Sequence, residues 1–253
     1  MGVIVLFNSN KAALRKRFNI NIESPEEAII ALAGNPNTGK STIFNNLTGM
    51  KQHTGNWPGK TVSQTQGKYI LDNKTYIVTD LPGTYSLFAN SIDEKIARDF
   101  ICFAHPDATV VVVDATCLER NLNMVLQVME ITPDVIVCLN LIDEAERKAI
   151  KIDFNALSAE LGVPVVPTAA RNGRGILDLK KAVKNLVAGN TVTTPRRIQY
   201  DWEIEKAVEQ LEIKIKAVIP DSLINPRWIA LRLIDGDRNL LNEINAYAKA
   251  MGY

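Results

Sequence analysis

The chain has 253 residues, with 29 Lys and Arg against 28 Asp and Glu, which gives a net charge of +1. A nearly neutral chain offers no bulk electrostatic reason to expect nucleic acid as a partner. Three cysteines without C-x-x-C spacing and two isolated histidines argue against a disulfide framework or a zinc site. No apolar run approaches the roughly 20 residues that span a bilayer, so we expect this piece to be soluble.

The first element with clear chemistry is a glycine-rich loop at residues 34–41, which reads GNPNTGKS and fits the phosphate-binding pattern G-x-x-x-x-G-K-[ST]. An apolar run at 28–33 predicts a buried strand before the loop, and residues 42–47 have helical spacing after it. Such a loop points backbone N–H groups and a helix dipole at a polyphosphate. Its lysine reaches the β- and γ-phosphates, and its Ser hydroxyl ligates Mg²⁺. The predicted nucleotide contacts here are Gly34, Asn35, Pro36, Asn37, Thr38, Gly39, Lys40, Ser41 and Thr42.

The second element is an acidic strand end. Residues 74–80 predict a strand that finishes in Asp80, and Leu81, Pro82 and Gly83 follow at once. Behind a phosphate loop, Asp80 would hold Mg²⁺, and the N–H of Gly83 would approach the γ-phosphate because glycine has no Cβ in the way. Taken alone, the same residues also fit an ordinary Asp-x-Pro-Gly turn.

The third element follows the apolar run 134–139 and reads Asn140, Leu141, Ile142 and Asp143. The Asp143 carboxylate can accept hydrogen bonds from the ring N–H and exocyclic amine of guanine, while Asn140 braces the loop and meets the base edge. Adenine would present a lone pair instead, and a site of this kind rejects the wrong base by a factor on the order of 10⁴. Alone, the tetrapeptide also fits a helix N-cap.

The fourth element is a short strand at 163–167 that ends in small residues, whose backbone N–H groups would reach the base oxygen. Its placement rests on the order of the motifs, because the residues themselves are undistinguished. The predicted contacts are Thr168, Ala169 and Ala170.

Together the four motifs resemble the Ras-like GTPase superfamily, which implies an α/β fold with a doubly wound, mostly parallel sheet. Further buried strands are predicted at 108–113 and 134–139, and helices at 118–131, 154–161 and 176–187. A hairpin of 62–71 with 75–79 adds one antiparallel edge strand. After a Thr-rich linker ending at Pro195, helical spacing over 204–215, 228–234 and 240–247 predicts a small all-helical domain.

The segment GNWPGKTV at 55–62, with DLPGTYSL at 80–87 and VDATCLERNL at 113–122, narrows the resemblance to the cytosolic GTPase region of the ferrous iron transport protein B family. This resemblance implies a GTPase domain at 26–190 and a helical bundle at 191–253 that leads to a membrane domain beyond the chain. It implies the cytoplasmic side of a bacterial inner-membrane Fe²⁺ importer, with the bundle as a regulator of nucleotide dissociation. Residues 1–25 have no counterpart, and their role stays open.

The same resemblance assigns roles to single residues. It implies that Thr61 is the switch I threonine that contacts Mg²⁺ and the γ-phosphate, with Ser41 and Asp80 as the other Mg²⁺ ligands. It also implies that the neighbours of Thr61 in the same loop contact the nucleotide, namely Gly59, Lys60, Val62 and Ser63. Asn37 becomes a K⁺ ligand, with the carbonyls of Asn56 and Trp57 completing the shell. A K⁺ there would neutralise developing charge as an arginine finger does. The catalytic set is then Lys40, Thr61, Gly83 and Asn37, and the cofactors are GTP or GDP, Mg²⁺ and K⁺.

Thr84 stands where many Ras-like proteins carry a glutamine that orients the attacking water. We therefore predict slow intrinsic hydrolysis, at a rate of order 10⁻⁴ per second or modestly above. Two alternatives stay open: a scaffold that binds GTP without hydrolysis, and a free-standing ribosome- or tRNA-associated GTPase. The second would normally carry a basic RNA-binding domain, which residues 196–253 do not resemble. The sequence does not decide between a monomer and a homo-oligomer.

Overall fold

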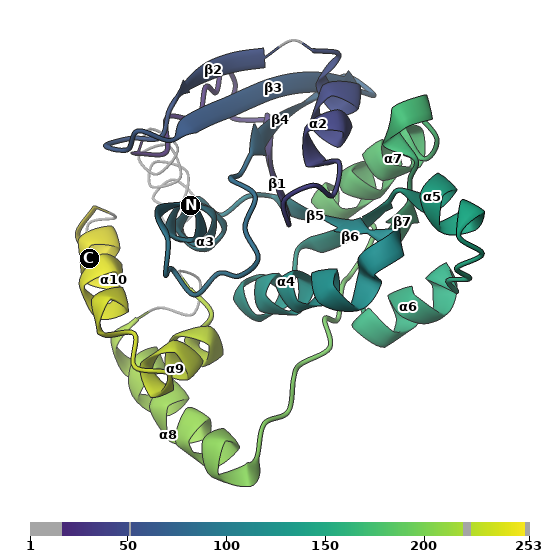
Figure 1. The fold of residues 1–253 in the computed structure, drawn as a ribbon. Coiled ribbons are helices and arrows are strands. Elements are labelled where there is room, and N and C mark those ends of the chain that lie inside the picture. Colours follow the sequence, from purple (N-terminus) through teal and green to yellow (C-terminus); the bar gives the residue numbers. More distant parts are fainter. Residues whose placement is uncertain (1–16, 51, 220–223, 251–253) are drawn as a thin grey trace.

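A computed structural model describes residues 17–50, 52–219 and 224–250. In this part of the chain a sheet of seven strands has the order β2-β3-β4-β1-β5-β6-β7 (Figure 1). Residues 1–16 of the predicted N-terminal extension lie outside the described residues, as do 220–223 and 251–253 of the predicted helical domain. The strands are β1 (Ala28–Gly34), β2 (Gln52–Asn56), β3 (Ser63–Leu71), β4 (Lys74–Asp80), β5 (Ala108–Asp114), β6 (Val135–Asn140) and β7 (Val165–Pro167).

The centre of the sheet is parallel because its strands are apolar throughout and are covered on both faces. β1 pairs in parallel with β4 and β5, and β5, β6 and β7 continue the parallel series. β3 runs antiparallel to both β4 and β2, which confirms the predicted antiparallel strand. The edge strand beyond β3 is β2, which the sequence did not predict: its residues QHTGN are exposed and show no apolar alternation.

Two hydrophobic cores lie on opposite faces of the sheet. Helices α2 (Lys40–Thr48) and α7 (Ile176–Val187) cover one face, where Phe44 and Leu179 belong to the same buried core as Ile30 of β1. Helices α3 (Ile92–Phe103) and α4 (Leu118–Ile131) cover the other, with Phe100 and Val125 fully buried. The short helices α5 (Ile142–Arg147) and α6 (Phe154–Leu161) lie between β6 and β7 in the chain. Helices at 118–131, 154–161 and 176–187 match their predicted ranges.

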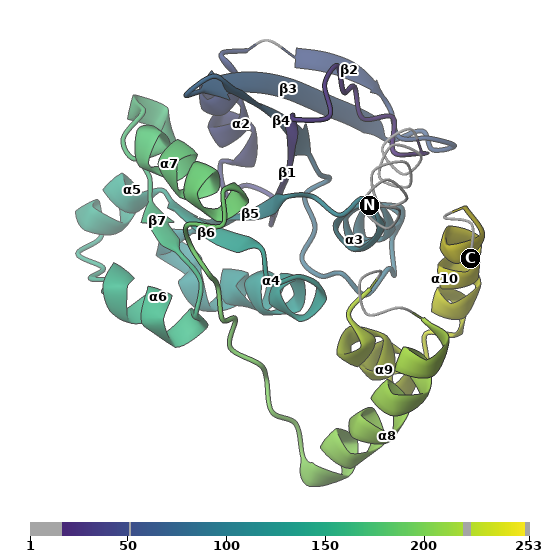
Figure 2. The same ribbon diagram turned by 180° about the vertical axis from the view of Figure 1, so that it is seen from behind.

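The predicted linker is fastened to the sheet domain before it enters the helical bundle. The Thr194 N–H donates to the Gly162 carbonyl at 2.9 Å, and the Arg196 N–H donates to the Leu161 carbonyl at 2.9 Å. The bundle then consists of α8 (Trp202–Val218), α9 (Pro226–Ile234) and α10 (Arg238–Ala250), close to the three predicted helices. Figure 2 shows the bundle to one side of the sheet, on the side where α3 and α4 lie.

A buried cluster of charges joins the bundle to α3. Arg98 of α3 is 1% exposed and contacts three carboxylates, those of its neighbour Asp99 and of Asp237 and Glu243 from the bundle. Lys95, one helical turn earlier, pairs with Glu243 as well. Because a buried guanidinium must be paired, α3 and α10 are held together by electrostatics as well as apolar packing. Among the described helices, none is long and apolar enough to cross a membrane.

Candidate nucleotide-binding site

Four segments singled out in the sequence meet at one edge of the sheet. The strands β1, β4, β5 and β6 pair with one another in parallel, so their carboxyl ends all lie at the same edge of the sheet. The phosphate loop (residues 34–41), Asp80 and Asn140 therefore emerge together at the carboxyl ends of the strands. This edge is where open α/β sheets bind their ligands.

The phosphate loop needs glycine at two positions for steric reasons. Gly34 has φ +152°, and a Cβ placed on it would lie 2.5 Å from the Val112 carbonyl oxygen. Gly39 has φ +81°, and its Cβ would lie 2.4 Å from Nδ2 of Asn140. A side chain at either position would push the loop away from β5 or β6. Asn37, between them, is exposed and also has a left-handed φ of 66°.

Lys40 and Asp80 form an ion pair at the base of this loop. The Lys40 ammonium contacts Oδ1 of Asp80 and donates to the Leu81 carbonyl at 2.6 Å. Burial raises the pKa of Asp80, and the charge of Lys40 opposes that rise. Both side chains are mostly buried, whereas Ser41 is exposed at the start of α2. A carboxylate and a hydroxyl at one strand edge are hard oxygen donors, so this pair of residues fits Mg²⁺.

Asn140 joins the phosphate loop to the segment after β7. Its side chain is 1% exposed, and its Nδ2 donates to the Thr38 carbonyl at 2.9 Å. Its Oδ1 accepts from Oγ1 of Thr168 at 3.2 Å and from the N–H of Ala170 at 3.0 Å. The Ala169 N–H donates to the Arg174 carbonyl at 3.0 Å. The two alanine amides expected at the base oxygen therefore already have protein partners.

Asp143 lies in the first turn of α5 and is half-buried. Leu141, in a left-handed conformation with φ 62°, turns the chain from β6 into this helix, and the Ile142 N–H donates to the Thr168 carbonyl at 3.2 Å. A recess of about 750 Å³ opens beside Asp143 and is lined also by Glu146, Arg147, Arg171 and Asn172. The two arginines carried no signal in the sequence, because neither belongs to a motif and only the fold brings them to Asp143.

The predicted switch I residues form a closed turn between β2 and β3, which we call the switch I turn (residues 57–62). The Trp57 N–H donates to the Val62 carbonyl at 2.9 Å, and the Lys60 N–H donates to the Trp57 carbonyl at 2.9 Å. The indole of Trp57 is 3% exposed and meets the Phe100 ring edge to face, with centroids 5.6 Å apart. Thr61 is exposed.

The three predicted K⁺ ligands lie in two segments: Asn37 is exposed on the phosphate loop, and Asn56 and Trp57 lie where β2 meets the switch I turn. The Trp57 carbonyl is used inside the turn, and Asn56 pairs with Ser63 in the β2–β3 ladder. Across residues 17–50 and 52–219, no hydrogen bond joins the switch I turn to the phosphate loop.

Gly83 and Thr84 begin a segment that we call switch II (residues 83–91), and they lie against the phosphate loop. A Cβ on Gly83 would be 3.4 Å from Pro36, and the Thr84 N–H donates to the Gly34 carbonyl at 3.3 Å. The Thr84 side chain is 4% exposed, and its hydroxyl has no hydrogen-bond partner among the described residues. It is buried beneath the loop, so it does not reach out as a water-orienting glutamine would.

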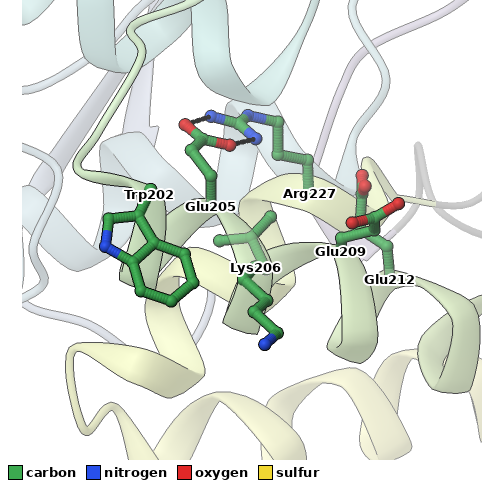
Figure 3. A pocket seen from close by; sticks show the side chains of 7 residues that line it. Trp202, Glu205, Lys206, Glu209, Glu212 and Arg227 are labelled. Atoms are coloured by element: carbon green, nitrogen blue, oxygen red, sulfur yellow. Dashed lines mark hydrogen bonds and ion pairs between the residues drawn. The ribbon is translucent and has the colours of Figure 1, made fainter.

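A second recess, of about 550 Å³, lies on the helical bundle along α8 (Figure 3). Arg227 of α9 closes one side of it through a bidentate pair with Glu205, at 2.7 and 2.8 Å. The Lys206 ammonium lies 5.4 Å from the ring centroid of the exposed Trp202. The Glu205–Arg227 pair joins α8 to α9 at this recess, and Glu209 and Glu212 line another part of it (Figure 3).

The fold and this edge of the sheet define the class of the protein. A parallel sheet with a glycine-rich loop leading into a helix, an acidic strand end and an Asn-x-x-Asp segment at the same edge is the architecture of P-loop GTPases. Among the described residues, no cluster of His, Cys, Asp and Glu has the composition of a separate metal site.

Within that class, the chain belongs to the ferrous iron transport protein B (FeoB) family. The family model for the N-terminal region of ferrous iron transport protein B matches residues 28–183, and the model for the FeoB cytosolic helical domain matches residues 200–251. The resemblance seen in the sequence is thereby confirmed. Residues 1–27 lie outside both matches.

Individual proteins agree with this membership. The chain is 41% identical over 212 residues to the Fe(2+) transporter FeoB of Escherichia coli K12, a match covering 82% of this chain and 27% of that relative. The cytosolic domain of the T. maritima FeoB iron transporter in apo form is 36% identical, with TM-score 0.80 over 88% of this chain and 86% of that one. The same domain in its GMPPNP form is 35% identical, with TM-score 0.79 over 88% and 86%. The chain thus spans about a quarter of the length of its curated relatives.

Proposed function

We propose that this chain binds GTP, hydrolyses it slowly, and uses the difference between the two nucleotide states to regulate Fe²⁺ passage through a membrane domain of the same protein. The observation that carries the proposal is the position of Asn140. Its side chain holds the phosphate loop at Thr38 and the segment after β7 at Ala170, so the triphosphate and base subsites are built as one unit.

Selection of guanine is assigned to Asp143 and to a backbone amide. The carboxylate beside the recess accepts from the base's ring N–H and exocyclic amine, as expected from the sequence. Since the N–H groups of Ala169 and Ala170 are occupied, the donor to the 6-oxo group is the next amide along, that of Arg171. Arg171 lies in the first turn of the 3₁₀ helix η2 (Ala170–Asn172), where N–H groups lack partners within the helix.

Magnesium would be held by Ser41 and Asp80, joined by Thr61 once the switch I turn opens. When bound, the ion would neutralise charge on the β- and γ-phosphates. The Lys40 ammonium, which now rests on Asp80 and the Leu81 carbonyl, is the group that exchanges this pairing for phosphate oxygens. Its present partners hold the ammonium in place at the loop before nucleotide arrives.

Hydrolysis is proposed to be slow because no side chain at position 84 orients the attacking water. The buried Thr84 hydroxyl supports this proposal. Asn37 is exposed on the loop, where a K⁺ could meet its amide oxygen beside the phosphates. Opening of the switch I turn would free the carbonyls of Asn56 and Trp57 to complete the K⁺ shell.

Coupling from switch II to the helical bundle is supported by direct contacts. The Leu87 N–H donates to Oε1 of Gln127 on α4 at 2.7 Å. The Arg232 guanidinium of α9 lies 4.6 Å from the centroid of the Phe88 ring. A γ-phosphate that pulls Gly83 toward itself would therefore strain contacts that reach α4 and the bundle.

The iron-transport role rests on the relatives, whose printed name is Fe(2+) transporter. The partner is then the membrane domain of the longer protein, with this part on the cytoplasmic side of the inner membrane. Both family matches are to ferrous iron transport protein B, which favours this role over that of a ribosome- or tRNA-associated GTPase.

The test is phosphate release from GTP in the purified chain, in matched KCl and NaCl buffers. We expect turnover near 10⁻⁴ per second in NaCl, faster in KCl, with Asn37→Ala removing the difference between the two salts. Binding of GTP without phosphate release would instead support the non-hydrolysing scaffold. Equal rates in both salts would remove K⁺ from the account.

A further inference from the structure

The segment that precedes both family matches lies against the strand that follows switch I. Residues 18–22, which we call the clasp, run along β3 on the sheet face that α3 and α4 cover elsewhere. The Phe18, Ile20 and Ile22 side chains join the hydrophobic core of that face. The sequence left the role of this segment open, and nothing in the nucleotide site uses it.

Two glutamines of β3 hold the clasp by its backbone. Nε2 of Gln64 donates to the Phe18 carbonyl at 2.9 Å, and Nε2 of Gln66 donates to the Asn19 carbonyl at 3.0 Å. Oε1 of Gln66 accepts from the Asn21 N–H at 3.2 Å. The two glutamines are only 2% and 6% exposed. Polar side chains that deeply buried must be hydrogen-bonded, so the clasp and β3 satisfy each other.

The clasp and the switch I turn share one aromatic support. The Phe100 ring of α3 receives Phe18 edge to face at 5.5 Å and Trp57 edge to face at 5.6 Å. Val62, at the other end of the turn, packs against the same core. Gln64 is only two residues beyond Val62, so the clasp fixes the turn at its Trp57 end through Phe100 and at its Val62 end through β3.

The contacts between the clasp and the switch I turn restrict how Thr61 can move. Thr65 pairs with Asp80 across β3 and β4, so Thr61 extends beyond the same sheet edge as the phosphate loop. β4 lies between β3 and β1 in the sheet. At the usual spacing of two strands, Thr61 is therefore displaced by about 10 Å across the sheet from the strand that leads into the phosphate loop. Movement of Thr61 over such a distance would draw the turn away from Phe100 and strain the Trp57–Val62 hydrogen bond.

We infer that the clasp is an intramolecular inhibitor of switch I: it stabilises the closed turn and so lowers the affinity for the triphosphate relative to the diphosphate. The inference rests on the proposed function, because it assumes that Thr61 is recruited by the γ-phosphate. GDP, which lacks that phosphate, binds without opening the turn and is unaffected by the clasp. Anything that withdraws residues 18–22 from β3 would then favour the GTP state.

The experiment compares Phe18→Ala with the unmodified chain. An edge-to-face pair contributes a free energy equivalent to about a two- to tenfold change in an equilibrium constant. We therefore expect Phe18→Ala to tighten GMPPNP binding by about two- to tenfold with GDP binding unchanged, both measured by competition with a fluorescent nucleotide. Hydrogen exchange of a peptide covering 57–63 should accelerate by a similar factor without nucleotide.

Two further variants keep the test decisive. Gln64→Met removes the donor to the clasp with little change in volume and should act in the same direction, even if Phe18→Ala does not fold. Lys68→Met is the matched control: Lys68 pairs with Glu23 and Glu27, on the same sheet face but beyond the clasp and away from the switch I turn. Lys68→Met should alter neither the ratio of GMPPNP affinity to GDP affinity nor the rate of hydrogen exchange at residues 57–63.

If the rate of hydrogen exchange at residues 57–63 were unchanged in both Phe18→Ala and Gln64→Met, the inhibitory role of the clasp would be overturned, whatever the nucleotide affinities are. An equal change in GDP and GMPPNP binding would overturn it too. Failure of the unmodified chain to bind GDP would instead overturn the proposed function, so the two failures are distinct.

Discussion

Replacing Arg98 with methionine removes the one cation that contacts all three carboxylates of the α3–α10 cluster. Methionine keeps the length and much of the apolar volume, so the change isolates the charge and its hydrogen bonds. Asp99, Asp237 and Glu243 would then remain close together, each no more than 23% exposed, with Lys95 as the nearby cation. Removing one partner from a buried ion cluster typically costs about 3–5 kcal/mol, because the remaining charges are left uncompensated.

For a chain of this size, each kcal/mol corresponds to roughly 2–4 °C in unfolding midpoint, so Arg98→Met should lower Tm by roughly 6–20 °C in calorimetry at neutral pH. The loss should shrink in acid. Burial already raises the pKa of Asp99, and Arg98 opposes that rise, so in the variant the Asp99 carboxylate protonates more readily and then carries no charge.

The control is Arg196→Met, whose partner Glu160 and own side chain are both exposed. An exposed pair contributes about 0–1 kcal/mol, so its Tm should move by no more than a few degrees. If Arg98→Met lowered Tm no more than the control does, or if its loss of Tm were the same at every pH, the buried charge cluster would not stabilise the contact between α3 and the bundle as described.

Three further outcomes are expected. Asp143→Asn should weaken GDP binding by about a hundredfold or more in calorimetry, because the amide presents N–H donors to guanine groups that are themselves donors. The variant should gain affinity for xanthosine diphosphate (XDP), whose base has an oxygen acceptor in place of the exocyclic amine. If the variant and the unmodified chain bound GDP equally well, the assignment of Asp143 to the base would be contradicted. Gly39→Ala should abolish nucleotide binding, since its Cβ would meet Nδ2 of Asn140 at 2.4 Å, and retained binding would show that the loop relaxes freely. The Arg227 guanidinium lowers the pKa of Glu205 to about 2, so this pair stabilises the fold above pH 4.5 and the stabilisation is lost as pH falls toward 2. The Tm difference between the unmodified chain and Glu205→Gln should therefore narrow over that range, and a constant difference would refute the pairing.

The sequence was most informative where local pattern and global fold agree. The ranges 118–131, 154–161 and 176–187 were recovered as α4, α6 and α7 because each combines amphipathic spacing with a stop signal. The meeting of the phosphate loop, Asp80 and Asn140 followed from the rule that parallel strands end at a common edge.

The misses have identifiable causes. Helix α3 was not predicted although Ser91 caps it, accepting from the Glu94 N–H at 3.1 Å; that cap was the available signal. β2 has no apolar pattern and is held by its ladder with β3, which no local rule reveals. The burial of Trp57 against Phe100 could not be predicted, because it depends on that same helix α3.

Partners contributed by tertiary contact also escaped prediction. The Lys40–Asp80 ion pair was not predicted, because the sequence motifs assign Lys40 to the phosphates and Asp80 to Mg²⁺. Arg171 lines the recess beside Asp143 only because of how the segment after β7 folds.

The recess beside Asp143 is proposed to distinguish guanine from adenine, next to a loop that would hold the phosphates. Titration calorimetry of the purified chain with GDP and with ADP, each with Mg²⁺, tests this directly. We predict measurable one-to-one GDP binding and an ADP affinity weaker by a factor on the order of 10⁴. Comparable affinity for both nucleotides, or binding of neither, would contradict the account.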